Sequence, residues 1–175
     1  MDRSLRERLC EMTLKPISEQ AAMLEQLRAE FSHSIQILDS EHPIEGYTCA
    51  VYAFHLVGDS VYQGIAASGL GSTFAGKDFV EFAIKEQLLA ECGAEDAIQG
   101  DMVVYLLDGR FGHIGRLQAD RRILSKWGTG YLCEHGLWEV PCSYGAEVRF
   151  FEGPGAENCF DIFVEYTKTR GFRWK

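Results

Sequence analysis

Apolar and polar residues follow two different periods along this chain, and the change between them predicts its architecture. Residues 18–38 and 77–92 both place apolar side chains broadly at helical spacing, with charged residues on much of the opposite side. Gly93 is expected to end the second of these helices. We expect residues 1–40 to form a helical leader that packs on a domain spanning residues 41–175.

The second half of the chain carries short runs of β-type residues separated by turn residues. The turns are "DGR" at 108–110 and "QADR" at 118–121. The expected strands are residues 101–107, 111–118, 121–127, 137–141, 146–153 and 159–166. Helices followed by a run of antiparallel strands are typical of an α+β fold rather than a doubly wound one.

The stretch "GYTCAVYAF", residues 46–54, predicts a central helix because it is apolar nearly all round, and Gly58 is expected to end that helix. Thr48 is a competent N-cap, which makes Cys49 the first helical residue. Tyr47, just before the cap, and Tyr52, at the fourth helical position, are placed to pack together as a hydrophobic staple.

A thiol at the first helical position lies among unpaired backbone N–H groups, at the positive end of the helix dipole. Both features favour thiolate, so we expect the pKa of Cys49 to fall below that of a free cysteine. The same N–H groups are placed to receive the oxyanion of a tetrahedral intermediate. The ordinary alternative is a core cysteine, because free cysteine is among the most buried residue types.

Charge and composition exclude several classes of function. A net charge of −9 over 175 residues argues against a nucleic-acid-binding protein, which needs a basic surface. No run is long and apolar enough to span a bilayer, and the amino terminus lacks the apolar run of a secretory signal. We therefore expect a cytoplasmic protein whose six cysteines are free thiols, while export by a route without a cleaved signal stays open. No CxxC pair occurs and the five histidines are scattered, so neither a metal nor another cofactor is expected.

A nucleophilic cysteine needs a base, and His113 is the histidine best placed to supply one. It lies inside the expected strand 111–118, between Gly112 and Gly115, whose small size lets another element approach closely. The alternative is an ordinary core histidine bonded to the backbone.

Four motifs follow one another along the chain, in the order "TCAVYAF", "GDMVVYL", "GHIGRL" and "RRILSKWG". Together they resemble the NlpC-type papain-fold cysteine peptidases and amidases, over the range Gly46–Gly128. Cys49, Gly100-Asp101, His113 and Gly115 match that family's pattern in order and in type. The resemblance implies a papain-like fold in which Cys49 is the nucleophile, its backbone N–H contributes to the oxyanion site, and His113 is the base.

The sequence departs from the family pattern at two places. It reads "YTCA" where members commonly have an acidic or amide residue before the cysteine and "SG" after it. The third catalytic position, often a histidine, falls by spacing on Ser125, whose hydroxyl would accept the ring N–H of His113. His135 is an alternative third residue. Lys126 is expected either to line the site or to be a solvated strand end, and Trp127 is expected to be a core residue rather than a substrate platform.

The activity that the resemblance implies is cleavage of an amide bond in a peptide or amide-containing substrate, through a cysteine-histidine acyl-enzyme mechanism without cofactor. Peptidoglycan peptides are the commonest substrates of that family. A transacylase or deamidase acting on a cytosolic target fits the sequence equally well. A third possibility is a papain-like binding module without catalysis, because a serine at position 125 supports an imidazolium less well than a carboxylate would.

Overall fold

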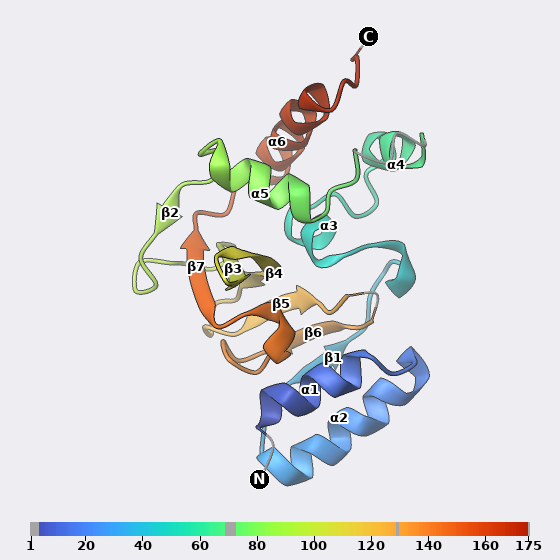
Figure 1. The fold of residues 1–175 in the computed structure, drawn as a ribbon, viewed down its shortest axis with the longest axis vertical. Helices are drawn as coiled ribbons and strands as arrows, with labels where there is room; N and C mark the ends of the chain where they lie inside the picture. The colour runs from blue at the N-terminus through green and yellow to red at the C-terminus, as the bar shows by residue number, and fades with distance from the viewer. Residues whose placement is uncertain (1–3, 69–72, 129, 175) are drawn as a thin grey trace.

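The computed structural model describes residues 4–68, 73–128 and 130–174. It is a mixed α+β fold built on one open antiparallel sheet with strand order β1-β6-β5-β4-β3-β7-β2, which confirms the α+β class predicted from the sequence (Figure 1). The strands are β1 (Gln36–Leu38), β2 (Glu91–Cys92), β3 (Met102–Leu107), β4 (Arg110–Leu117), β5 (Ile123–Lys126), β6 (Leu132–His135) and β7 (Glu147–Phe151). The helices are α1 (Leu5–Thr13), α2 (Ile17–Phe31), α3 (Cys49–Ala53), α4 (Ser60–Ala67), α5 (Lys77–Lys85) and α6 (Ala156–Thr169), with 3₁₀ turns η1 (Ile44–Gly46) and η2 (Cys142–Tyr144).

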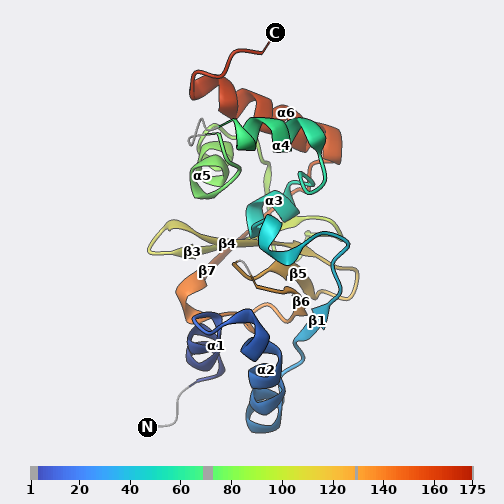
Figure 2. The same ribbon diagram turned by 90° about the vertical axis from the view of Figure 1, so that its right-hand side faces the viewer.

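The sheet separates two apolar cores. Figures 1 and 2 show helices α3 to α6 on one side of the sheet and α1 and α2 on the other. Because successive strand residues point to opposite faces, Val104 and Ile114 enter the core under α3, while Val103 and Tyr105 enter the core under the leader. These are called the α3-side core and the leader-side core below. Each functional side chain can therefore be assigned to one face.

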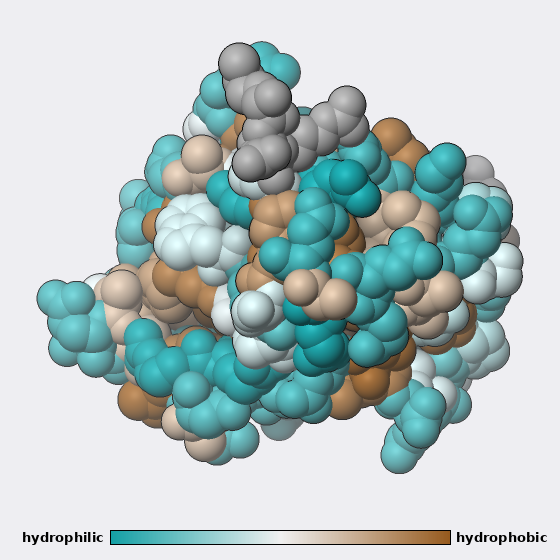
Figure 3. Space-filling view, turned by 90° about the horizontal axis from the view of Figure 1, so that it is seen from below, coloured by the Kyte–Doolittle hydropathy of each residue, from teal (hydrophilic) through white to brown (hydrophobic). Residues whose placement is uncertain are grey.

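The leader is held on the sheet by apolar burial and by its own strand. The first helix starts with a capping box, in which Ser4 and Glu7 bond each other's backbone N–H groups. The leader buries Leu9, Met12, Leu24 and Leu27 in the leader-side core. Strand β1 then joins the sheet at its edge by pairing antiparallel to β6. The outer surface at this end of the molecule is mostly hydrophilic, with apolar areas that are small and separate (Figure 3).

The structure differs from the sequence-based expectation at two of the expected strands. Residues 159–166, expected as a strand, belong to helix α6 instead. Their buried members are Cys159, Ile162, Phe163 and Tyr166, which is the spacing of one helical face. Residues 137–141, all within the described part of the chain, form no strand and connect β6 to η2.

Three helices are shorter than expected. Helix α2 ends at Phe31, and the last residues of the expected helix 18–38 form strand β1 instead. The cysteine helix α3 ends at Ala53 rather than at Gly58, because the chain turns at His55, whose φ of 54° is left-handed. Helix α5 ends at Lys85, and the residues that were expected to continue it lead instead into the edge strand β2. Among the described residues no helix combines the length and the apolarity needed to cross a membrane.

Candidate active site

Cys49 is the first residue of α3, as the sequence predicts, and Thr48 before it has the extended backbone of an N-cap. The Thr48 side chain makes no capping bond, and its buried Oγ1 has no hydrogen-bond partner in the described ranges. Tyr47 and Tyr52 stack with their ring centroids 6.2 Å apart, which confirms the predicted staple. The entry into α3 is therefore set by aromatic packing, with no contribution from a threonine cap.

The Cys49 thiol is more strongly desolvated than the sequence suggested. Burial raises its pKa, and this effect outweighs the backbone N–H groups of Ile114, Ala50 and Cys49 itself and the ammonium group of Lys126, all of which act to lower it. The expected fall in the pKa of Cys49 is therefore wrong for this structure. A helix of five residues has a small dipole, and desolvation exceeds it, so the resting group at neutral pH is a thiol.

His113 lies in the leader-side core. In the β3–β4 pairing it faces Tyr105, a member of that core, and its ring stacks on Tyr144 with centroids 4.0 Å apart and planes inclined by 13°. The side chain is 1% exposed. Burial, followed by the nearby His135, holds the pKa of His113 well below the usual histidine value, so the ring is neutral at neutral pH.

The resemblance implies that Cys49 and His113 act as a nucleophile–base pair, but no hydrogen bond joins their side chains in this structure. His113 Nε2 is buried and has no hydrogen-bond partner among the residues that the structure describes. Cys49 packs against the α3-side core together with Ile114, whereas the His113 ring lies on the opposite face. The sulfur faces the backbone N–H of Ile114, the residue after His113. The Cys49 sulfur therefore lies beside β4, next to the residue that follows His113, but the two side chains are not paired.

Ser125 bonds to His135 rather than to His113. Its Oγ lies 2.8 Å from His135 Nε2, and Trp127 Nε1–H donates to the same Oγ at 3.1 Å. His135 Nδ1 lies 2.8 Å from the carbonyl oxygen of Gly136, which can only accept, so Nδ1 carries the proton. The pKa of His135 falls to about 4 because of burial, so the neutral ring leaves Nε2 to accept the Ser125 hydroxyl proton.

This chain of bonds corrects the assignment of the third residue. The single hydroxyl proton of Ser125 and both ring nitrogens of His135 are used within the chain, so neither residue orients His113 in this structure. Trp127 is 3% exposed and belongs to the leader-side core, as expected. Ser125, Trp127 and His135 therefore form one buried polar group next to His113.

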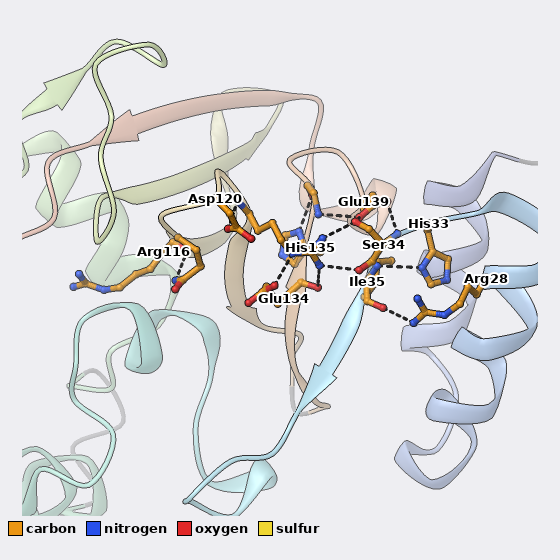
Figure 4. Close-up of polar contacts among 12 residues, drawn as sticks. Arg28, His33, Ser34, Ile35, Arg116, Asp120, Glu134, His135 and Glu139 are labelled. Atoms are coloured by element: carbon orange, nitrogen blue, oxygen red, sulfur yellow. Dashed lines mark hydrogen bonds and ion pairs between the residues drawn. The ribbon is translucent and has the colours of Figure 1, made fainter.

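A carboxylate from the connection after β6 holds the group in place from the leader side (Figure 4). Glu139 accepts the backbone N–H of Gly136 at 2.8 Å, and on its other side it accepts the Ser34 N–H and hydroxyl at 2.8 and 2.6 Å. Arg122 donates to Ser34 Oγ at 2.8 Å and to Glu134 Oε1 at 2.6 Å. The leader thus fixes the position of the Gly136 carbonyl that sets the His135 tautomer.

Lys126 lies on the Cys49 side of the sheet and is fully buried, so it is not a solvated strand end. Its Nζ donates to the carbonyl oxygens of Gly128 and Gly130 at 3.2 and 2.5 Å and lies 5.0 Å from the Tyr47 ring centroid. Within the described ranges no carboxylate lies within ion-pair distance of it. Burial lowers its pKa to about 8, and the Cys133 and Cys49 sulfurs act to raise it.

Tyr144 is the residue that sequence reasoning missed. Its carbonyl approaches Gly112 so closely that a Cβ there would lie 2.1 Å from the oxygen, which explains the glycine before His113. Burial raises the pKa of the Tyr144 hydroxyl, as does the charge that Cys49 would carry, so the phenol lies within the electrostatic range of the sulfur. The "YG" pair at 144–145, which follows the "SKWG" and "CEHG" motifs, was the available signal.

Gly100 and Asp101, the other matched motif, serve the fold instead of the chemistry. The Asp101 carboxylate accepts the backbone N–H groups of Ile98 at 2.7 Å and Gly153 at 2.8 Å, and Gly100 has a φ of 95°. These bonds fix the start of β3 to the segment between β7 and α6. The strand is thereby held in register beneath Cys49 and α3.

A cavity of about 320 Å³ lies beside the start of α3. It is lined by Asp39, Ser40, Glu41, His42, Tyr47, Tyr52, His55, Val57 and Leu132. The two tyrosines of the staple thus border this cavity, whereas Cys49 and Lys126 do not line it. Within the described part of the chain no group of three or more histidine, cysteine or carboxylate side chains is arranged to hold a metal ion.

Comparisons of the chain with protein-family models, with curated proteins and with solved structures found no significant match. The likeness to the papain-fold peptidases therefore depends on the four motifs.

Proposed function

We propose that this protein is a cysteine-dependent hydrolase of a peptide or amide bond, with a papain-like arrangement in which Cys49 is the nucleophile. The single observation that supports this most is the environment of the sulfur. Three backbone N–H groups, those of Cys49, Ala50 and Ile114, face it at the start of a helix. Such a cluster is suited to stabilising the negative charge that develops during acyl transfer.

In the proposed mechanism the resting pair is a neutral thiol and a neutral imidazole, in agreement with the raised pKa of Cys49 and the lowered pKa of His113. Substrate binding brings the two together. His113 takes the thiol proton as the sulfur forms its bond to the carbonyl carbon, and the carbonyl oxygen becomes an oxyanion held by backbone N–H groups. His113 then returns the proton to the leaving nitrogen as the amide bond breaks, and water releases the acyl group from the sulfur.

Two features of the structure support a base role for His113 once the site rearranges. Its Nε2 has no partner within the described ranges, so no existing bond must be broken before it accepts a proton. Its ring is held by stacking on Tyr144, whose side chain is itself within the electrostatic range of the sulfur. Movement of Tyr144 is the rearrangement that we propose for pairing the thiol with the imidazole. Lys126 adds a buried positive charge that favours thiolate on the same side.

Acylation by an activated ester tests this function without knowledge of the substrate. The protein is incubated with p-nitrophenyl acetate, and intact mass and peptide mapping locate the acetyl group. We expect one acetyl group on Cys49, released slowly by water, and no acetylation there in His113→Asn. Cys133→Ala is the matched control, because Cys133 is also a buried thiol with a raised pKa but lies on the leader side. Acetylation spread over other residues, with Cys49 unmodified, would refute the proposal.

A papain-like binding module without catalysis is the second candidate, and a specific observation favours it. Ser125 and His135 are bonded to each other, and among the described residues none bonds to His113 Nε2. In that case the cavity of about 320 Å³ beside α3 is the ligand site. The two candidates differ in the acylation experiment: a binding module gives no acetyl-Cys49 at any pH, while retaining its fold by circular dichroism.

A further inference from the structure

Two cysteines outside the candidate active site lie near each other where α1 packs against η2. Cys10 is on α1, and Cys142 opens the turn η2, far away in the sequence. Each of the two thiols shifts the pKa of the other, and Ser143, the residue after Cys142, lowers the pKa of Cys10, so the three side chains lie close together where α1 meets η2. Neither thiol is in a disulfide in this structure. The sequence alone suggested only unremarkable core or loop thiols.

Hydrogen bonds and apolar burial hold α1 against η2. The Arg6 guanidinium, one turn before Cys10, donates to the carbonyl oxygens of Val140 at 3.1 Å and Pro141 at 3.4 Å, and also to that of Gly145. These acceptors lie on both sides of η2 in the sequence. Leu9, next to Cys10, is completely buried in the leader-side core, so the helix cannot slide along the turn.

Reactivity distinguishes this pair from the other thiols. Cys142 is exposed and Cys10 is half-buried, so an oxidant in solution can reach them. The hydrogen bond from Ser143 lowers the pKa of Cys10, more than burial raises it. By contrast Cys133 and Cys159 are buried, with pKa values raised to about 12 and about 11. A reachable thiol with thiolate character beside a second thiol is the arrangement of a redox-sensitive cysteine with its resolving partner.

We propose that Cys10 and Cys142 are an oxidation site, which hydrogen peroxide converts to a disulfide between α1 and η2. The Cys10 thiolate attacks one peroxide oxygen, the O–O bond breaks, and hydroxide leaves, so that Cys10 becomes a sulfenic acid. The Cys142 sulfur then loses its proton and attacks the Cys10 sulfur, and the hydroxyl group departs with a proton as water. Two thiols lose two electrons in total, and one peroxide is reduced to two waters.

The disulfide would act on the part of the fold next to His113. Tyr144, which stacks on the His113 ring, is in the same 3₁₀ turn as Cys142. A covalent link from that turn to α1 restrains the segment that carries Tyr144. The inference itself depends only on the contact between the two thiols, so it does not rest on the proposed hydrolase function.

The test uses the complete chain, reduced and then treated with hydrogen peroxide. Peptide mapping without reductant should give the Cys10 and Cys142 peptides linked and two hydrogens lighter, and reductant should restore the free thiols. The melting temperature should rise on oxidation and fall again on reduction, because the link restrains the unfolded chain. Cys92→Ser is the matched control, since Cys92 is half-buried but its pKa is raised; it should oxidise like the wild type.

Single variants distinguish the thiol that is oxidised first, Cys10, from the thiol that then forms the disulfide with it, Cys142. Cys142→Ser should leave Cys10 as a sulfenic acid that dimedone traps, while Cys10→Ser should give neither the disulfide nor dimedone labelling at Cys142 at the same peroxide concentration. Disulfides that form only between two molecules would appear as dimers on a non-reducing gel, and their yield would fall when the protein is oxidised at lower concentration; this result would overturn the proposal. So would oxidation of Cys92 or Cys49 before Cys10 in the wild type, a measurement that requires no variant.

Discussion

Acid should destabilise this protein well above the pH at which its carboxylates are protonated, because two buried histidines, His135 and His113, have lowered pKa values. The His135 ring is completely buried, and its pKa falls from 6.5 to about 4 because of burial. Between these two values the unfolded chain binds a proton at residue 135 that the folded protein does not bind. The free energy of unfolding therefore rises with pH in this window and is lost as the pH falls from about 6.5 towards 4.

The size of the effect follows from the shift. A difference of one pKa unit corresponds to about 1.4 kcal/mol, so His135 contributes about 3 kcal/mol that is present above pH 6.5 and lost by about pH 4. His113 acts in the same direction, because burial also lowers its pKa well below 6.5. A domain of this size is stable by roughly 5–15 kcal/mol, so the loss is a large fraction of the total.

Urea unfolding followed by tryptophan fluorescence, repeated at pH steps from 7 to 4, measures the slope directly. The variant His135→Asn keeps an acceptor for Ser125 but cannot titrate, so it should lose most of the pH dependence even if its stability at pH 7 is lower. His42→Asn, at an exposed histidine, is the control and should follow the wild type. A wild-type free energy that stays constant between pH 6.5 and 4.5, or an undiminished slope in the double variant His113→Asn/His135→Asn, would refute the reasoning.

Three other substitutions have definite expected outcomes. Ser125→Ala removes the hydrogen-bond partner of His135 Nε2 and Trp127 Nε1, so it should lower the free energy of unfolding in urea by about 2–4 kcal/mol. The control Ser60→Ala, at an exposed serine, should lower it by no more than about 0.5 kcal/mol. Equal effects of the two variants would contradict the hydrogen bonds proposed for Ser125. Gly145→Ala should lower the melting temperature strongly, because φ is 119° and the added Cβ would lie 2.0 Å from a carbonyl oxygen; an unchanged melting temperature would show that the turn can relax. Lys126→Met should slow acetylation of Cys49 without loss of stability, since it replaces a buried ammonium that has no carboxylate partner among the described residues by an apolar side chain. A faster reaction would exclude the proposed role of the charge.

Much of the secondary structure was predictable because it is local. The amphipathic spacing of the leader and of α5, the turns flanking β4, and the tyrosine staple at α3 all depend on residues a few positions apart. Helix α6 was not recognised, because its many β-branched and aromatic residues resemble a strand locally. Its period was present in the sequence, but burial of Ile162 and Phe163 against α5 and the sheet is what makes it a helix.

For the candidate site, the sequence by itself determined to which helix or strand most of the candidate residues belong. It identified Cys49 as the first residue of its helix and His113 and Ser125 as members of adjacent strands. Only the tertiary structure decided which face each side chain occupies and how strongly it is desolvated. The register that pairs His113 with Tyr105 places the ring away from Cys49.

The same distinction explains the hydrogen-bond partners. Ser125 and His135 meet because β5 and β6 pair, and Cys10 meets Cys142 because α1 covers the sheet beside η2. No periodic spacing in the sequence predicts either contact, because each joins two distant segments that only the packing of the whole chain brings together. The local sequence thus indicates the helix or strand in which most of these residues lie. The hydrogen-bond partners and the pKa of each group depend on packing and burial, which only the complete fold creates.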